Sequence, residues 1–396
     1  MTTPLQRLGE LTDLISSGST PKGGSKVYLE NGPVLFIRSQ NVRMNELDLT
    51  DVAYISEDVD TGMKRTRVRA NDVLLNITGA SIGRVAVFGM AHLRANVNQH
   101  VCIIRPKNGR LCSRYLCHYL ATPAFQAEIN RVQNGGTRQA LTVTQIADFK
   151  IPLPVFENQC RIASILEKAA NLLRKRAAAL SLADRVAAAA FRQRFGDVDG
   201  NPKQLPIVPL IDLCRRITDG THQPPKLIRE GIPFLFVSNI RGGRIDFSTK
   251  NFITRETWQT LTARCPVEVN DILYTNVGSY GNAALVRTSS PFAFQRHIAH
   301  IKPDPSKVNP EFLSIMLESG GVRRQVDSLV RGIAQKTLNL SELRTVRVFD
   351  LPMPIQAEFS KLAGVTRRIR AQATQSLADA EQMLSALVDS AFRGKL

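Results

Sequence analysis

Few side chains of this sequence have the spacing that a catalytic motif requires. Gly79-Ala-Ser-Ile-Gly83 has the pattern of a nucleophile elbow, but the related stretch Gly278-Ser-Tyr-Gly281 loses that spacing, so a turn is the better interpretation. Gly18 and Gly23 have the separation of a phosphate-binding loop, but Gly24 stands where such a loop needs lysine. The patterns G-x-G-x-x-G and H-E-x-x-H are absent, as is the tetrapeptide typical of amino-methyltransferases. We therefore predict no catalytic residue in this chain.

Metal ligands and cross-linked cysteines are not expected either. His297 and His300 lie three residues apart, and a single pair of this kind is more often structural than metal-binding. The six cysteines include no C-x-x-C pair, which is typical of reduced thiols in a cytoplasmic protein. No apolar run approaches membrane-spanning length, and the first residues lack the pattern of a signal peptide. We expect a cytoplasmic chain with no metal, no cofactor of its own and no membrane contact.

The charge of the chain points to a polyanionic partner. Its 396 residues include 52 Lys and Arg against 34 Asp and Glu, a formal net charge of +18. A balance this basic favours nucleic acid, the commonest polyanion in the cell. The alternative is a basic protein whose charge serves solubility alone.

Polar side chains able to read base edges gather in a few loops. Arg and Lys pair well with guanine, and Asn and Gln pair well with adenine, in the major groove. The alternative for each Asn is that it only forms a turn. Scattered basic residues at 64, 65, 67 and 69 would contact phosphates, which position a protein without specifying sequence. The predicted DNA-contacting residues are Arg38, Gln40, Asn41, Ser81, Arg84, Asn98, Gln99, Thr137, Arg138, Gln139, Lys226, Asn239, Arg241, Asn276, Tyr280, Asn282, Gln295, Arg296, Gln335 and Lys336.

The elements that must position these side chains occur twice. Residues 207–354 repeat the order of residues 7–155, with small shifts in spacing. Asp271-Ile-Leu273, for example, matches Asp72-Val-Leu74. The matching positions are apolar, Gly or Pro, whereas the polar residues between them mostly differ. This pattern is typical of one scaffold that was duplicated and now binds two different targets.

A long helix follows each copy of the scaffold. Residues 158–194 and 356–392 carry apolar stripes with steps of three and four, which predict a helix face packed on a partner. Each helix of about 37 residues would be ~55 Å long. Prolines 152, 154, 352 and 354 would hold extended chain before the helices. The basic cluster at 174–176 is open to two interpretations: a solvated helix face, or a contact with phosphate or an acidic partner. The predicted docking residues are Ile162, Leu166, Leu173, Leu180, Phe191, Leu362, Ile369, Leu377, Leu384 and Phe392.

These elements predict an α+β chain with a pseudo-two-fold internal repeat. Two mixed recognition domains, at 1–155 and 201–354, alternate with two helical segments, at 156–200 and 355–396. The domain between the helices must return the chain, so the helices are expected to pair as an antiparallel coiled coil.

The chain resembles the specificity subunit of type I restriction–modification systems. In that family a Pro-Leu-Pro segment is typically followed by Glu-Gln and a helix; here Pro152-Leu-Pro154 precedes Glu157-Asn-Gln159. The second copy, Pro352-Met-Pro354 before Gln356, departs further. The turn between residues 79 and 83, the Asn-Gln step at 98–99 and the Gly-Gly-Thr loop at 135–137 are similar too.

The resemblance implies a division of labour. Each recognition domain would read one half of a bipartite, asymmetric site on double-stranded DNA. The helices would set the gap between the half-sites and dock two methyltransferase subunits, which would carry S-adenosylmethionine and methylate adenine. A motor/nuclease subunit would add DNA cleavage. Two alternatives stay open: a scaffold that bridges two proteins without DNA, and a nuclease or methyltransferase with an unrecognised site.

Overall fold

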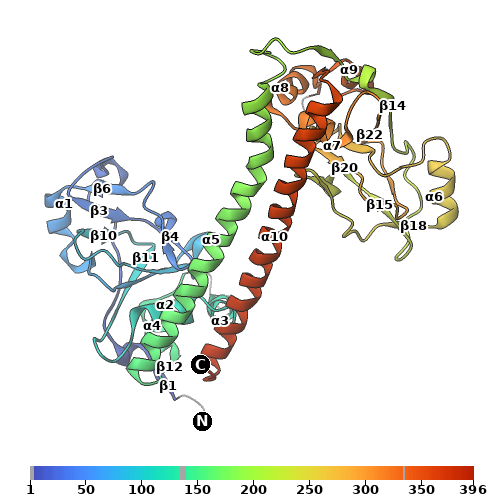
Figure 1. The fold of residues 1–396 in the computed structure, drawn as a ribbon. Helices are drawn as coiled ribbons and strands as arrows, with labels where there is room; N and C mark the ends of the chain where they lie inside the picture. The colour runs from blue at the N-terminus through green and yellow to red at the C-terminus, as the bar shows by residue number, and fades with distance from the viewer. Residues whose placement is uncertain (1–3, 134–139, 333–334) are drawn as a thin grey trace. The chain divides into compact units, whose positions relative to one another are not determined.

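The computed structural model describes residues 4–133, 140–332 and 335–396 (Figure 1). Contacts divide the chain into two compact units. Unit 1 combines Met1–Lys175 with Ala378–Leu396, and unit 2 is Arg176–Leu377. The boundary falls inside both long helices, α5 (Phe156–Phe195) and α10 (Met353–Phe392), so each unit contains one predicted recognition domain and part of each helix.

Unit 1 is built on two four-stranded sheets, formed by fully buried runs such as Val-Leu-Phe-Ile in β3 and Val-Leu-Leu-Asn in β8. The first sheet, which is antiparallel, has the order β2 (Thr12–Ser17), β11 (Val101–Pro106), β8 (Val73–Asn76), β9 (Val85–Val87). The second has the order β6 (Ala53–Ile55), β3 (Val34–Ile37), β10 (Ala95–Val97), β7 (Arg67–Val68), with β3 and β10 parallel. The remaining strand pairs are β1 (Leu5–Arg7) with β12 (Lys150–Pro152) and β4 (Val42–Arg43) with β5 (Glu46–Leu47).

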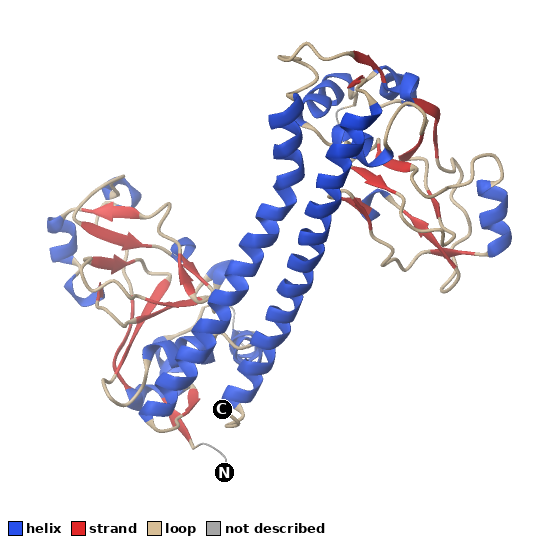
Figure 2. Ribbon diagram, viewed as in Figure 1, coloured by secondary structure: helices blue, strands red, loops and turns tan. Residues whose placement is uncertain are grey.

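Short helices join the unit 1 sheets to the long helices. They are α1 (Glu57–Gly62), α2 (Ser113–Leu120), α3 (Pro123–Gln133) and α4 (Val143–Asp148). Tyr115 and Leu116 of α2 are buried in one cluster with β8 and with Ile162 and Leu166 of α5. Helix α2 therefore packs between a sheet and the start of α5 (Figure 2).

Unit 2 repeats this plan. Its antiparallel sheet has the order β14 (Cys214–Asp219), β22 (Ile298–Pro303), β19 (Ile272–Thr275), β20 (Ala283–Leu285). Its second sheet has the order β18 (Phe252–Ile253), β15 (Ile232–Leu235), β21 (Ala293–Phe294), with β15 and β21 parallel. The other strand pairs are β13 (Ile207–Pro209) with β23 (Arg347–Phe349) and β16 (Ile240–Arg241) with β17 (Arg244–Ile245). The short helices are α6 (Arg255–Thr262), α7 (Pro310–Leu317), α8 (Gly320–Leu329) and α9 (Leu340–Thr345).

The predicted fold class is confirmed, and the repeat extends to buried hydrogen bonds. Gln159 and Gln356 are each the fourth residue of a long helix, and both are fully buried. Gln159 Oε1 accepts from Cys112 N (2.9 Å), and Gln356 Oε1 accepts from Asn309 N (2.8 Å). Each amide nitrogen donates to two backbone carbonyl oxygens. The same anchor fixes the start of both helices.

This equivalence corrects one part of the sequence prediction. Helix α10 begins at Met353, so Pro354 lies in its first turn and not in an extended lead-in. Proline is tolerated there because the first helical N–H groups have no intrahelical acceptor. Pro154 does precede its helix, which begins at Phe156. The two proline segments are therefore similar in sequence but lie at different positions relative to the start of the helix that follows.

Within unit 2 the two long helices run antiparallel, as predicted. Asp184 of α5 pairs with Arg370 of α10, whereas Arg194, further along α5, pairs with Glu358 (2.7 Å). Residue numbers thus rise on one helix as they fall on the other. Helix α5 ends where Gly196 adopts a left-handed conformation, with φ of +80°.

Candidate nucleic-acid interface

In unit 1, hydrogen bonds gather three of the predicted DNA-contacting loops at one end of the sheets. Asn76, the last residue of β8, donates to Ser39 O (2.8 Å) and to Ser81 Oγ (3.1 Å). Asn98 N, after β10, donates to Ile37 O at the end of β3 (3.1 Å). The loops that follow β3, β8 and β10 therefore lie side by side. We call this edge, at residues 38–41, 78–84 and 98–100, the loop rim of unit 1.

Unit 2 forms the equivalent rim. Gln295 N donates to Leu235 O (3.1 Å), which matches the bond of Asn98 in unit 1. Gly278 N donates to Lys336 O (2.9 Å), so the segment 335–337 joins the loop after β19. The loop rim of unit 2 comprises residues 236–241, 276–282, 295–297 and 335–337. The predicted contact residues between 236 and 336 come together here.

Side chains able to reach a ligand are found on both rims and beside them. The predicted residues that are exposed are Gln40, Gln99, Lys226, Arg241, Arg296, Gln335 and Lys336. Those that are partly exposed are Arg38, Ser81, Arg84, Asn282 and Gln295. Thr137, Arg138 and Gln139 lie outside the described residues.

Five of the predicted residues are buried, and for these the structure favours an internal role. They are Asn41, Asn98, Asn239, Asn276 and Tyr280. Asn41 Oδ1 accepts from Arg38 N, and its amide nitrogen donates to Asp48 O (3.0 Å). Asn239 makes the same two bonds, with Phe236 N and with Asp246 O (2.9 Å). These two side chains close turns, which is the alternative that the sequence left open.

The other buried residues are also held inside the fold. Asn98 Oδ1 accepts from His100 N (3.2 Å), and Tyr280 Oη donates to Asp327 (2.9 Å). Asn276 is buried directly after β19. A base could reach these side chains only if the loops rearranged.

Asp51 holds two side chains of the unit 1 rim in place, those of Arg38 and Gln40. Arg38 donates to Asp51 O (2.9 Å) and lies over the ring of Tyr28, 6.0 Å from its centre. Gln40 Nε2 donates to Asp51 Oδ2 (2.7 Å). Positioned side chains lose less rotamer entropy on binding. A base or phosphate that approached Gln40 would compete with Asp51 for its amide.

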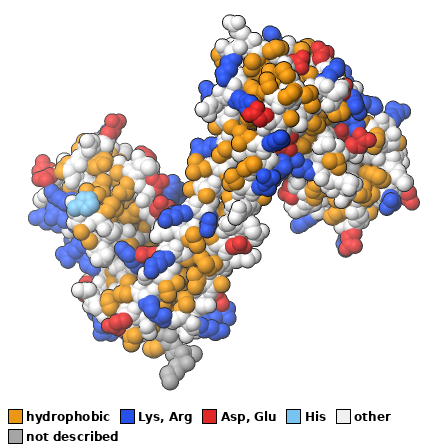
Figure 3. Space-filling view, viewed as in Figure 1, with side chains coloured by type: hydrophobic (Ala, Val, Ile, Leu, Met, Phe, Trp, Pro, Cys, Tyr) orange, Lys and Arg blue, Asp and Glu red, His pale blue; other side chains and the backbone are white. Residues whose placement is uncertain are grey.

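Basic side chains lie on both units and along the long helices (Figure 3). Lys64, Arg65 and Arg69 are exposed, as phosphate contacts would require, but Arg67 pairs with buried Asp60 (2.6 Å). Burial disfavours ionisation of Asp60, yet hydrogen bonds from Arg67, Asn96 and Arg94 outweigh it and hold its pKa below the ordinary value. Arg67 therefore serves an internal ion pair.

An arginine cluster in unit 2 was missed by the sequence analysis. Arg244, Arg287, Arg367 and Arg370 line a cavity of about 370 Å³ together with apolar side chains of β17 and β20. Glu311 pairs with both Arg287 (2.6 Å) and Arg367 (2.8 Å). Burial and the nearby Arg370 lower the pKa of Arg244. No local pattern predicts this cluster, because the four arginines come from three segments that are far apart in sequence.

The predicted docking residues fall into three classes. Ile162, Leu166 and Phe191 are buried in the cores of the chain itself. Leu362 and Ile369 of α10 are 42% and 54% exposed. The half-buried residues are Leu173, Leu180, Leu377, Leu384 and Phe392. Only the last two classes can contact a partner directly.

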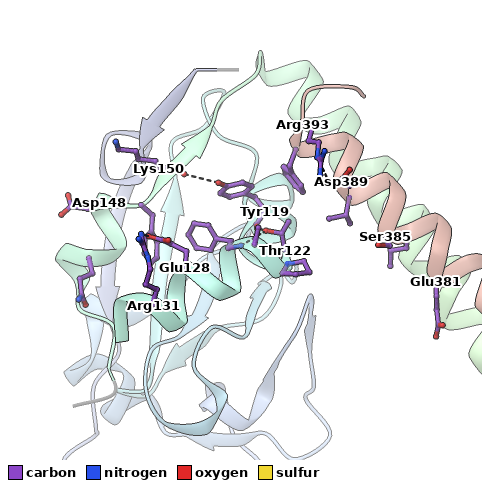
Figure 4. Close-up of a pocket in the computed structure, with 18 of the residues that line it drawn as sticks. Tyr119, Thr122, Glu128, Arg131, Asp148, Lys150, Glu381, Ser385, Asp389 and Arg393 are labelled. Atoms are coloured by element: carbon purple, nitrogen blue, oxygen red, sulfur yellow. Dashed lines mark hydrogen bonds and ion pairs between the residues drawn. The ribbon is translucent and has the colours of Figure 1, made fainter. Parts of the chain in front are cut away.

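A large groove in unit 1 contains three of these half-buried residues. Leu173, Leu384 and Phe392 line it with Tyr119 and Phe125, and its volume is about 1230 Å³. The floor is apolar, and the rim carries charges of both signs, including Glu128, Arg131, Asp389 and Arg393 (Figure 4). Apolar floors with polar rims are typical of protein-binding surfaces.

In unit 2 the corresponding surface is covered by the segment after α5. Pro123 and Ala124 of α3 line the groove of unit 1, and Gly320 and Gly321 take their places in α8. A Cβ on Gly321 would lie 2.7 Å from the backbone nitrogen of Val198, which is buried in the core of unit 2. The open groove in unit 1 is thus the position that a peptide segment occupies in unit 2.

Among the described residues, no three His, Cys, Asp or Glu side chains are grouped to hold a metal ion. None of the helices in the described ranges is both long and apolar enough to cross a membrane.

Comparison with known proteins finds similarity to specificity subunits of type I restriction enzymes. Residues 5–181 match the model of the type I restriction modification DNA specificity domain. The EcoBI specificity subunit of Escherichia coli is 26% identical over 335 residues, which is 76% of this chain and 69% of the relative. The MjaIX specificity subunit of Methanocaldococcus jannaschii is 22% identical over 372 residues, or 88% and 83% of the two chains.

Solved structures agree in fold. The S subunit of a type I restriction–modification system from M. genitalium has a TM-score of 0.61 at 14% identity, over 99% of both chains. A chain from a structure on the assembly and conformational transition of the type I R-M system has a TM-score of 0.59 at 16% identity, over 100% of both chains. At these identities the likeness concerns the fold alone.

Proposed function

Because the chain belongs to the family of type I restriction–modification specificity subunits, we propose that it reads a bipartite, asymmetric DNA site, with one half-site for each unit. A specificity subunit recognises DNA and is not itself an enzyme. The proposal concerns the finer points: two half-sites, the residues that read them and the partners that the chain holds.

One observation carries the two-half-site proposal: equivalent rim positions are exposed in both units but differ in residue type. Gln99 follows buried Asn98 in unit 1, and Arg296 follows Gln295 at the matching place in unit 2. Glutamine favours adenine and arginine favours guanine in the major groove. Two rims of one shape with different side chains suit two different half-sites.

The partners in this proposal are two methyltransferase subunits and, in a restricting system, a motor/nuclease subunit. The methyltransferase subunits would carry S-adenosylmethionine, and this chain would carry no cofactor. Exposed apolar side chains support docking on the helices: Leu362, Val365 and Ile369 lie at steps of three and four on α10, and Leu182 and Val186 are exposed on α5. The groove of unit 1 offers a further docking surface.

The helices would fix the separation of the half-sites. Forty helical residues span ~60 Å. That length is sufficient for two readers placed about one duplex turn apart, ~34–36 Å. We also propose that the chain acts in the cytoplasm, where it would meet its DNA.

The direct test is to sequence single DNA molecules from the host with and without the gene and to map methylated adenines. We expect a split motif that disappears on deletion. Substitution of Arg138 or Gln139 should alter one half of that motif and spare the other. If both halves degrade equally, these residues do not read bases.

Two further measurements address the alternatives. Methyl transfer by the purified chain alone would contradict the proposal and favour an enzyme. Subunit assembly that persists while the complex shows no preference for the mapped motif would favour a scaffold that does not read DNA.

A further inference from the structure

Three side chains of unit 2 form a hydrogen-bonded row that the proposed DNA function does not use. Cys265 Sγ lies 3.4 Å from Nδ1 of His300, and Nε2 of His300 lies 2.7 Å from Oδ2 of Asp271. Cys265 follows α6, Asp271 precedes β19, and His300 lies in the central strand β22. His300 is 1% exposed, whereas Cys265 is half-buried and reaches solvent.

The acceptors in this row fix the position of each proton. The Asp271 carboxylate can only accept, so Nε2 of His300 carries the hydrogen that it donates. Nδ1 then has a free lone pair, which accepts the thiol hydrogen of Cys265. Lys302 Nζ also donates to Asp271 (2.8 Å) and keeps that carboxylate ionised. This order of thiol, imidazole and carboxylate is the arrangement that activates nucleophilic cysteines.

The electrostatics of the row agree with proton transfer from sulfur to imidazole. Burial alone would raise the pKa of Cys265, but the hydrogen bond with His300 and the positive charges of His300, Arg216 and Lys302 together outweigh it, and the pKa falls below the ordinary value. Burial alone would lower the pKa of His300, but the hydrogen bonds and charges of Asp271 and Cys265 together outweigh it, and the pKa rises. Arg216 and Lys302 add positive charge near the sulfur.

Two further charged groups near the row, Glu268 and Arg216, have partners of their own. Glu268, on the same loop as Asp271, pairs with Lys302 (2.8 Å). Arg216, on the neighbouring strand β14, donates to Arg264 O next to Cys265 (2.8 Å). The positive groups therefore face the sulfur from two strands, and the carboxylates lie on the far side of the imidazole or against Lys302.

Unit 1 shows that the fold does not need this row. Cys265 N donates to Thr262 O, and Thr66 N makes the matching bond with Met63 O, so Thr66 is the counterpart of Cys265. Ile103 is the counterpart of His300, because Ile103 lies opposite Leu74 of β8 and His300 lies opposite the equivalent Leu273 of β19. The acid–base pair beneath is retained, as Asp72 with Arg105 (2.7 Å). Unit 2 thus adds a thiol and an imidazole to a framework that is complete without them.

We propose that Cys265 is a nucleophilic thiol and a modification site that forms mixed disulfides with small disulfide molecules. His300 takes the thiol proton at Nδ1, and the sulfur of Cys265 attacks one sulfur of the disulfide. A new sulfur–sulfur bond forms to Cys265 as the old one breaks. The leaving thiolate receives the proton from His300, so one disulfide is exchanged for another and one small thiol is released.

The other cysteines provide internal controls. Cys160 is exposed on α5, but burial and the neighbouring Cys112 raise its pKa. Burial raises the pKa of Cys102, Cys117 and Cys214 to about 12. If exposure alone set the rate, Cys160 would react fastest. If His300 activates the thiol, Cys265 reacts fastest, so the order of the two rates distinguishes these cases.

The test uses the full chain and the aromatic disulfide 5,5′-dithiobis(2-nitrobenzoate), with release of the coloured thiol followed by absorbance and the labelled cysteine identified by peptide mass spectrometry. At about pH 6, Cys265 is expected to react about tenfold faster than Cys160, because His300 lies 3.4 Å from the sulfur of Cys265 and can take its proton. The ratio should shrink as the pH rises towards the raised pKa of Cys160, because its own thiolate then forms without a base. A rate for Cys265 equal to or below that of Cys160 at the lower pH would overturn the proposal.

Matched variants separate the roles. Cys265→Ser should remove the fast phase, and Cys160→Ser should remove only a slow phase. His300→Gln should slow Cys265 about tenfold at about pH 6 and leave Cys160 unchanged. If His300→Gln does not fold, the pH profile of the wild-type chain still decides, since it requires no variant.

Discussion

The two units share several buried hydrogen-bonded anchors and differ more widely at the surfaces that meet solvent. Gln159 and Gln356 anchor the long helices through equivalent bonds, and Asn41 and Asn239 close equivalent turns. A buried amide that lost its partners would cost free energy in either unit. The buried amides that anchor these segments are therefore constrained by the fold, whereas exposed side chains can change without that cost.

The ends of the long helices show the opposite trend. Phe191 is enclosed in unit 2, with the rings of Phe195, Phe312 and Phe359 centred 5.1–5.6 Å away. Phe392, at the matching end of α10, is half-buried against two tyrosines and lines the groove of unit 1. The same Ala-Phe-Arg sequence thus lies in a closed core in one unit and at an open surface in the other.

The largest expected effect tests that difference directly. Phe191→Ala should destabilise unit 2 by about 4 kcal/mol, whereas Phe392→Ala should cost unit 1 about 2 kcal/mol, because a half-buried ring leaves a smaller cavity. Native-state hydrogen exchange with mass spectrometry reports each unit separately. Equal losses would mean that the groove of unit 1 is closed in solution.

The helix anchors should behave alike. Gln159→Ala and Gln356→Ala each leave one backbone N–H and two carbonyl groups without their partner, and we expect each to cost about 3 kcal/mol. Chemical denaturation, combined with the same exchange measurement, gives both values. A difference larger than about 1 kcal/mol would show that the two anchors are not energetically equivalent.

The rims should act independently. Gln99→Ala should weaken discrimination at one half-site by about 1–3 kcal/mol, and Arg296→Ala should do so at the other half-site by a similar amount. Competition binding of the assembled complex, with DNA randomised in one half-site at a time, measures both. Loss at the same half-site for both variants would contradict one reader per unit.

The smallest expected effect is a difference in how the stability of unit 2 depends on pH. His300→Ile gives unit 2 the residue that unit 1 has at this position, Ile103. The pKa of His300 is raised in the folded chain, so its contribution to stability is complete below the unfolded pKa of about 6.5 and is lost as pH rises through the folded value. The free energy of unfolding of the wild type should therefore fall over that range relative to that of the variant. Parallel pH curves for the two proteins would show that His300 makes no such contribution.

Sequence periodicity and order predicted most of the fold, because both reflect which residues are buried. Helix α5 was expected at 158–194 and is found at Phe156–Phe195. The loops of the rims were expected from the positions of Gly79, Gly278 and Gln295, and they come together as described above. Strand ends and turn residues are local signals, which a sequence displays directly.

Burial of single polar side chains could not be predicted in the same way. Asn98 and Gln99 are adjacent and similar in chemistry, yet one is buried and the other exposed. Likewise, Leu362 and Ile369 belong to the apolar stripe of α10, but they are exposed on the described chain. Both outcomes depend on which segment lies opposite, and that is set by tertiary contacts between residues far apart in sequence.

In a helix that is shared by two units, a change in length also changes the rotational orientation of the residues beyond it. The boundary between the units falls after Lys175 on α5 and after Leu377 on α10. Each residue inserted there would add about 1.5 Å and rotate everything beyond it by about 100°. Four residues would add about 6 Å and end only about 40° from the starting phase, whereas two would end about 160° away. An insertion in such a helix therefore preserves the rotational orientation of the residues beyond it only if it adds close to a whole number of helical turns. The helix lengths that keep this orientation differ by steps of about one turn.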